Sequence, residues 1–172
     1  MKAIVVIFIA ALLIRSVSLF KSRVNEKKLR RQNAKEYGKH NSLVLTISHI
    51  LYYVGCFTEA ILREPAINAY TYVGIGLFVF SMVMLWIVIF SLRDLWTIKL
   101  FIAPHHNLNT SPLFKIVKHP NYFLSIIPEL LAIALICQAW TVLVVGFPLY
   151  SVPLTIRIIQ ERDAMKSVFP DY

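Results

Sequence analysis

The chain has 172 residues, of which 58% are hydrophobic, and it carries a formal net charge of +9. So much apolar sequence excludes an ordinary soluble domain. The charge does not indicate a nucleic-acid partner, because the basic residues gather beside apolar runs, where they are typical of loops that face anionic lipid. We therefore expect an all-α integral membrane protein.

The first apolar run predicts a membrane helix over residues 1–20, interrupted only by Lys2 and Arg15. Arg15 lies close enough to the basic side for its long side chain to snorkel there. A cleavable signal peptide is the alternative, but no convincing small-x-small site precedes Arg15, so an uncleaved helix is favoured. A basic arm follows over residues 21–41. It has no proline, and we expect it to extend the first helix.

The next two runs predict membrane helices over residues 43–62 and 67–91. The second contains a long stretch without any charge, enough to cross a hydrocarbon core of roughly 30 Å. Its glycine pair, Gly74 and Gly76, indicates helix packing and not nucleotide binding. His49, inside the first of these helices, is a weak candidate for a functional residue.

The last run, from Phe123 to Ile156, has one charge, Glu129, and is too long for a single crossing. We expect a hairpin of two helices, 122–137 and 139–157, with Gln138 near the turn. Prolines within both helices should distort them. Cys56 and Cys137 fall inside membrane runs, and we expect neither a disulfide nor a metal site there.

The chain thus has five predicted crossings in one domain. Fifteen of the 18 Lys and Arg residues fall in the arm 21–39, in the loop 92–120 and after Ile156. The positive-inside rule then places the N-terminus outside and the C-terminus in the cytoplasm. We expect the arm 21–39 to lie near anionic lipid.

A polar, basic segment, residues 106–122, leads directly into the fourth predicted helix. Pro120 suits a first helical turn, and the unpaired N–H groups beside it suit a carboxylate or phosphate. His119 is equally compatible with a role as ligand contact and with a role as helix cap. Tyr122 is compatible with a role in the site and with a role as interfacial anchor. Glu129 lies about two turns deeper, on the face of Tyr122. It is either a functional group or a neutral hydrogen-bond partner of a distorted carbonyl.

Arg157 and Glu161 stand four residues apart where the last helix leaves the membrane. In isolation they could be only a solvated ion pair. Together with the His-Pro-Asn-Tyr helix start they predict a pocket with a charged half and an apolar half. Such a pocket suits a reaction between a polar donor and a lipid-like acceptor. His105 and His106 lack partners at zinc-like spacing, so we expect no metal.

KHPNY, a helical hairpin and RIIQE, in this order, resemble the isoprenylcysteine carboxyl methyltransferase family, over roughly residues 92–172. The N-terminal half is similar to the short bacterial branch of that family. The resemblance implies a multi-pass S-adenosylmethionine-dependent methyltransferase of the bacterial cell membrane, without a Rossmann domain. It implies O-methylation of a lipophilic carboxylate, phenol or pyrone.

The resemblance also assigns roles to residues. Arg157 would face the acceptor. Independently of the resemblance, a phenol or enol acceptor would benefit from a base, for which Glu129 and His119 are candidates. Cofactor contacts are implied for the residues that match the family's motifs, namely His106, Asn107, Leu108, Asn109, Phe114, Lys118, His119, Pro120, Asn121, Tyr122 and Glu161. Lys118 stands where the family has arginine and cannot bind a carboxylate bidentately.

Two other functions are compatible with the sequence. A non-catalytic carrier or subunit of a membrane complex would need five helices and a basic arm, but no cofactor. A lipid-surface adaptor would act through the KKLRR stretch of the arm. The sequence indicates neither the acceptor nor the oligomeric state.

Overall fold

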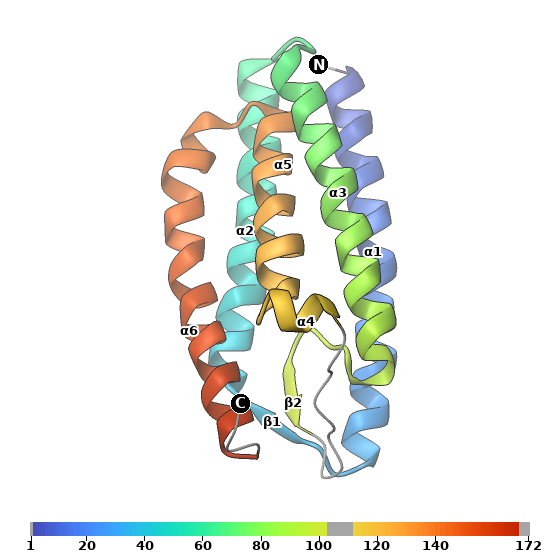
Figure 1. Cartoon of the computed structure of the whole chain (residues 1–172). Coiled ribbons are helices and arrows are strands. Elements are labelled where there is room, and N and C mark those ends of the chain that lie inside the picture. Colours follow the sequence, from blue (N-terminus) through green and yellow to red (C-terminus); the bar gives the residue numbers. More distant parts are fainter. Residues whose placement is uncertain (1, 103–111, 169–172) are drawn as a thin grey trace.

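The structure is a computed structural model that describes residues 2–102 and 112–168. Long helices run side by side along the bundle, and the two ends of the chain lie at its opposite ends (Figure 1). The elements in chain order are α1 (Lys2–Arg31), β1 (Lys35–Tyr37), α2 (Lys39–Arg63), α3 (Ala69–Leu92), η1 (Arg93–Leu95), β2 (Leu100–Ile102), α4 (Pro112–Ile116), η2 (Asn121–Ile126), α5 (Ile127–Cys137), η3 (Val142–Gly146) and α6 (Phe147–Lys166).

Four helical segments are long and apolar enough to cross a membrane: Lys2–Arg31, Lys39–Arg63, Ala69–Leu95 and Val142–Lys166. This agrees with the expected all-α membrane protein. The segment Asn121–Cys137 is apolar but shorter, so the fifth crossing stays a prediction. A turn at Gln138 separates α5 from the helix that follows, and α5 and α6 run in opposite directions (Figure 1).

The first helix departs from its predicted bounds. It continues to Arg31, so the expected helical extension is confirmed for the first half of the arm, and residues 1–20 are only its first part. The second half of the arm instead forms β1 and the start of α2. The predicted snorkelling of Arg15 is wrong, since its side chain is buried and pairs with Glu129 of α5 at 2.8 Å. The length of α1 explains the difference: Arg15 stands at the middle of a 30-residue helix and not near its end.

Proline widens the helical turns on both sides of the Gln138 turn. The π-helical segment η2 ends two residues before Pro128, and η3 ends two residues before Pro148. A proline ring clashes with the carbonyl four residues earlier in an α-helix. The wider turn moves that carbonyl away, which is a known way to accommodate proline. The predicted distortion therefore takes the form of π-helical turns.

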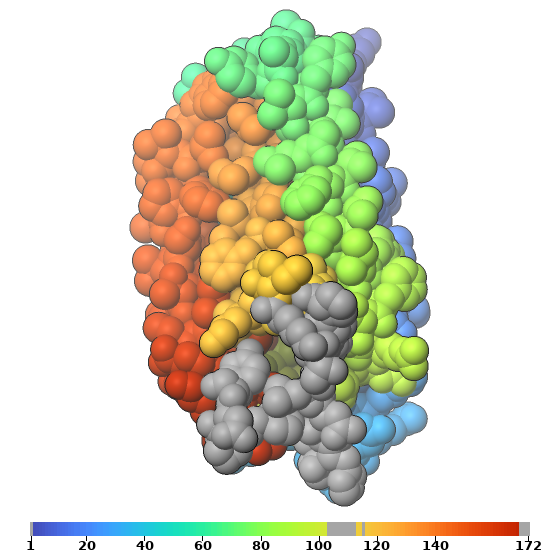
Figure 2. Space-filling view, in the orientation of Figure 1, coloured from blue at the N-terminus to red at the C-terminus, as the bar shows by residue number. Residues whose placement is uncertain are grey.

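The core is densest where α3 meets α5, and Figure 2 shows α5 seated between α3 and α6 on this face. Gly74 allows this approach, because a Cβ there would lie 2.8 Å from the backbone nitrogen of Ile136. Gly76 has nothing within 4 Å of the equivalent position. The packing role is thus confirmed for Gly74. Cys56 and Cys137 are buried and free, as predicted.

A small antiparallel sheet, absent from the sequence prediction, closes the end of the bundle that holds the C-terminus (Figure 1). We call this the basic end. Lys35 of β1 pairs with Ile102 of β2. The segment before β2 is tied to α1, because the Asn25 amide donates to the carbonyls of Arg93 and Trp96 at 2.9 and 2.8 Å. These bonds hold the segment that leads into β2 against α1.

Candidate functional site

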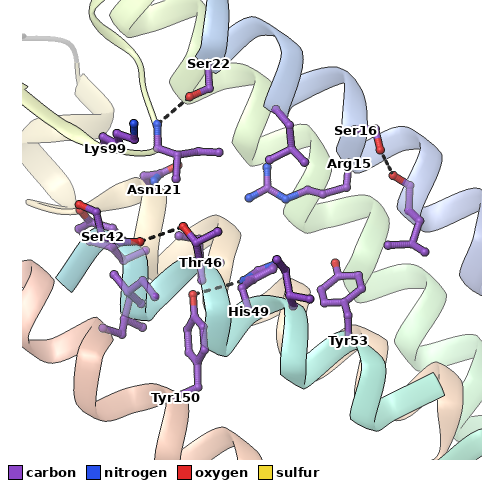
Figure 3. A pocket seen from close by; sticks show the side chains of 18 of the residues that line it. Arg15, Ser16, Ser22, Ser42, Thr46, His49, Tyr53, Lys99, Asn121 and Tyr150 are labelled. Carbon is purple, nitrogen blue, oxygen red and sulfur yellow. Dashed lines mark hydrogen bonds between the residues drawn. The ribbon is translucent and has the colours of Figure 1, made fainter. Parts of the chain in front are cut away.

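A cavity of about 800 Å³ lies between α1, α2 and α6 and reaches η2 and the segment before β2. Its apolar wall is built from aliphatic and aromatic side chains of the two N-terminal helices, including Phe8, Leu12, Leu45, Val54 and Phe57. Arg15 of α1 and His49 and Tyr53 of α2 point into the same space (Figure 3). The cavity therefore combines an apolar wall with charged and polar side chains.

Three residues that the sequence singled out form one hydrogen-bonded group at the basic end. The Glu161 carboxylate lies 3.0 Å from His119 Nδ1 and accepts a 2.5 Å hydrogen bond from the Tyr122 hydroxyl. Pro120 starts the helix at the expected place, which aims Tyr122 inward from η2 toward α6. His119 and Tyr122 are both buried, whereas a quarter of the Glu161 side chain is exposed.

These contacts decide two of the alternatives. His119 serves the helix start through its backbone carbonyl, which accepts from the N–H groups of Tyr122 and Phe123, while its side chain pairs with Glu161. Tyr122 is not an interfacial anchor, because only 6% of it is exposed and its hydroxyl is bonded within the bundle.

Arg157 is 3% exposed and does not pair with Glu161. Its Nη1 donates to Ser42 Oγ at 2.7 Å, its Nη2 to the Ile98 carbonyl at 2.8 Å, and its Nε to the Tyr122 hydroxyl at 3.3 Å. The interpretation as a solvated ion pair is therefore wrong. A guanidinium has five N–H donors, and the bonds to the described residues use three, so within that part of the chain Arg157 leaves two donors unused at the cavity wall.

The remaining predicted cofactor residues are placed unevenly. His106, Asn107, Leu108 and Asn109, like His105, lie outside the described residues. Asn121 lines the cavity, and its Oδ1 accepts a long 3.4 Å bond from Trp96 Nε1. Phe114 is half-buried against the core, Pro120 is fully buried, and Lys118 is exposed at the helix start.

Glu129 is fully buried at a deeper level of the bundle. Its Oε1 lies 2.8 Å from Arg15 Nε and 3.6 Å from His49 Nε2, and accepts a 2.6 Å hydrogen bond from the Tyr53 hydroxyl. The alternative of a neutral Glu129 bonded to a carbonyl near Pro128 is therefore wrong, because the carboxylate pairs with Arg15 and its other partners are side chains of α2. Glu129 is not among the residues that line the cavity, which argues against a direct role as base.

Sequence reasoning missed most of the partners that hold these groups. Ser42 and Tyr53 carried no motif, and Trp96 stood in a loop. Arg15 did carry a signal, because an arginine inside an apolar run marks by default a functional site or a buried partner. Glu129 was the matching acid, at a comparable depth in another predicted helix.

Basic side chains surround the cavity floor, where Arg23 and Lys99 belong to the lining. Lys99 pairs with Glu26 at 2.7 Å, beyond the part of α1 predicted to cross the membrane. Partial burial would raise the pKa of Glu26, but hydrogen bonds and charges from Lys99 and Arg30 outweigh it, so the pKa lies below its usual value. Glu26 is therefore an ionised partner of Lys99 at the cavity floor.

The site thus places the Glu161 carboxylate and the buried Arg157 guanidinium beside an apolar cavity, linked through the Tyr122 hydroxyl. The family model of the isoprenylcysteine carboxyl methyltransferases matches residues 74–167, which include Tyr122, Arg157 and Glu161. The chain belongs to this family. Membership indicates a membrane methyltransferase, and enzymes of the family generally use S-adenosylmethionine.

Two relatives share almost the whole chain. A protein of Haemophilus influenzae, described only as uncharacterized, is 43% identical over 163 residues, or 95% of each chain. The uncharacterized protein YpbQ of Bacillus subtilis is 29% identical over 93% of this chain and 95% of its own. No solved structure matches. The similarity thus extends through α1 and α2, beyond the region that the family model covers.

Proposed function

We propose that this protein transfers the methyl group of S-adenosylmethionine to an oxygen of a lipophilic acceptor held in the cavity. The observation that carries the proposal is the hydrogen-bonded group of Glu161, Tyr122 and Arg157. It joins a partly exposed carboxylate to the wall of an apolar chamber. A water-soluble donor and a membrane-soluble acceptor can be held on its two sides.

The residues present fit the cofactor. Glu161 retains exposed surface and can accept from an ammonium or from ribose hydroxyls. The exposed Lys118 and the helix start at Pro120 suit a carboxylate. When bound, S-adenosylmethionine supplies an electrophilic methyl carbon, which bonds to the acceptor oxygen as the bond to sulfur breaks. His119 holds Glu161 in place from the side opposite Tyr122.

Arg157 is the residue that we assign to the acceptor. Its three bonds fix the plane of the guanidinium, and its remaining donors can hold the acceptor oxygen as an anion. Methyl transfer needs a straight approach of the oxygen to the carbon, so a fixed guanidinium contributes by orientation. A carboxylate acceptor reaches Arg157 already ionised, whereas a phenol or enol must first lose a proton to a base.

The test is titration of S-adenosylhomocysteine into the detergent-purified protein. We expect wild type to bind, Glu161→Ala to lose at least tenfold in affinity, and Asp163→Ala to bind as wild type does. Asp163 is the matched control, because it is an exposed acid two residues further along α6. A folded wild type without affinity would refute the proposal and favour a carrier. Equal losses of affinity in Glu161→Ala and Asp163→Ala would contradict the assignment of Glu161 to the cofactor site.

Transfer itself is checked by incubating bacterial membranes with methyl-labelled S-adenosylmethionine and following label in the lipid extract. Arg157→Lys keeps the charge but loses the planar set of donors. We expect it to bind S-adenosylhomocysteine and to lose most of the transfer. Undiminished transfer in Arg157→Lys would contradict the assignment of the acceptor to Arg157.

A further inference from the structure

Three polar side chains form a first level of hydrogen bonds in the cavity wall, near the basic end. They are Ser42 of α2, Tyr122 of η2 and Arg157 of α6. On each of these three helical segments, another polar residue stands seven positions deeper in the bundle. Seven residues of α-helix correspond to two turns and about 10 Å. On α2 and α6 the deeper residue therefore faces the cavity as the first one does, whereas the π-helical turn of η2 intervenes on the third segment, whose deeper residue does not line the cavity.

The deeper residues are His49, Glu129 and Tyr150. The Tyr150 hydroxyl lies 3.3 Å from His49 Nδ1, and both residues line the cavity (Figure 3). Glu129 lies behind them and contacts Arg15 and Tyr53, which also line the cavity. We call Arg15, His49, Tyr53 and Tyr150, backed by Glu129, the deep polar level. Glu129 acts as a buried counter-charge that holds polar groups at the cavity wall.

A purely apolar ligand would fit this level poorly. Polar and charged groups inside a membrane protein are costly unless they are paired. The pairing here is incomplete on the cavity side. His49 Nε2 is turned toward Glu129 at 3.6 Å, and the Tyr150 hydroxyl, which lines the cavity, is bonded among the described residues only to His49 Nδ1. An alkyl tail running past Arg15 and His49 would exclude water without replacing the hydrogen bonds that water makes to these side chains. A hydroxyl or carbonyl group on the tail would replace them.

We propose, on the basis of the methyltransferase function above, that the acceptor carries a second hydrogen-bonding group, bound by the deep polar level. The group is a hydroxyl or a carbonyl about 10 Å from the oxygen that Arg157 holds. An extended chain advances about 1.2 Å per bond, so the group stands roughly eight bonds along the tail. The acceptor is thus an oxygenated lipid and not a simple fatty acid or isoprenoid.

A structural role for the deep polar level is the competing explanation. The Arg15–Glu129 pair joins α1 to α5, and it would do so with any ligand or none. Stability measurements do not separate the two explanations. Ligand selectivity does, because a purely structural cluster has no reason to distinguish tails that differ in one oxygen.

The experiment compares the affinities of three probes by calorimetric titration in detergent. The first is octadecanoic acid. The second carries a hydroxyl about eight bonds from the carboxyl, near the middle of the chain, and the third carries the hydroxyl at the far end. We expect wild type to bind the mid-chain hydroxy acid about tenfold more tightly than the other two, the size of one hydrogen bond. His49→Phe should abolish this preference, and Tyr150→Phe should reduce it.

Thr46→Val is the matched control. Thr46 also lines the cavity on α2, but its hydroxyl already donates to the Ser42 carbonyl, so the preference should remain. Binding of S-adenosylhomocysteine is measured on every variant to show that the fold and the cofactor site persist. Equal affinities of wild type for the three acids, or a preference that survives His49→Phe, would overturn the inference. If the folded wild type does not bind S-adenosylhomocysteine at all, the proposed function itself would be refuted.

Discussion

The buried pair of Arg15 and Glu129 gives the sharpest prediction about stability. Replacing Glu129 with leucine removes a fully buried carboxylate and leaves Arg15, itself 9% exposed, without its counter-charge. Breaking a buried pair by removing one partner costs about 3–5 kcal/mol. In a chain of 172 residues, each kcal/mol lowers Tm by about 2–4 °C, so Glu129→Leu should unfold about 6–20 °C below wild type.

The assay is thermal unfolding in detergent, followed by tryptophan fluorescence, for both single variants and for the double variant Arg15→Leu/Glu129→Leu. We expect the double variant to be more stable than either single one, because a buried pair replaced by apolar groups leaves no unpaired charge. Glu161→Leu is the control, because the Glu161 carboxylate is partly exposed. Its melting temperature should fall by less than that of Glu129→Leu. A Glu129→Leu protein that melts with wild type, or a double variant whose loss equals the sum of the single losses, would refute the reasoning.

Further predictions concern packing, a cap and an ion pair. Gly74→Ala should cost about 1–3 kcal/mol, because its Cβ would meet the backbone of α5, whereas Gly76→Ala should be neutral or stabilising in the same thermal assay. Glu59→Ala should cost about 0.5–2 kcal/mol, since the carboxylate accepts from the N–H groups of Thr141 and Val142 in the first turn of the helical segment after Gln138; unchanged melting would contradict this cap. The stability that Glu26 draws from Lys99 should be present above the usual carboxyl pKa of 4.5 and lost as pH falls through the lower pKa of the folded state. This contribution is measured from the melting temperatures of wild type and Glu26→Gln across this pH range. Melting temperatures of the two proteins that change with pH in parallel would contradict it.

The sequence predicted the helical class and the chemistry at the basic end, because both depend on local patterns. Long apolar runs imply helices, and the His-Pro-Asn-Tyr start and the Arg-x-x-x-Glu exit lie where chain segments enter or leave the bundle. Prediction failed where a side chain turns toward a partner far away in the chain. Arg157 and Glu161 share a helix face, yet each prefers a partner on another segment, namely Ser42 and His119.

The cavity and the sheet were harder to foresee for a related reason. Strands of three residues, such as β1 and β2, have no periodicity that a sequence can reveal, and their pairing joins segments on either side of two helices. Arg15 was misjudged because its depth depends on where α1 ends, and the helix continues well past the apolar run. The roles assigned to His106 through Asn109 stay predictions, since they lie outside the described residues.

The late pairing of β1 with β2 has a consequence for biogenesis. The ribosome makes β1 before α2 and α3, and it makes β2 only after both, so the sheet at the basic end can form only once two further helices have been made. A nascent chain that stops short of Leu100 would leave β1 as an open edge strand. The cavity is completed later still, because α6, which supplies Arg157 to its wall, is the last of the described helices to be made.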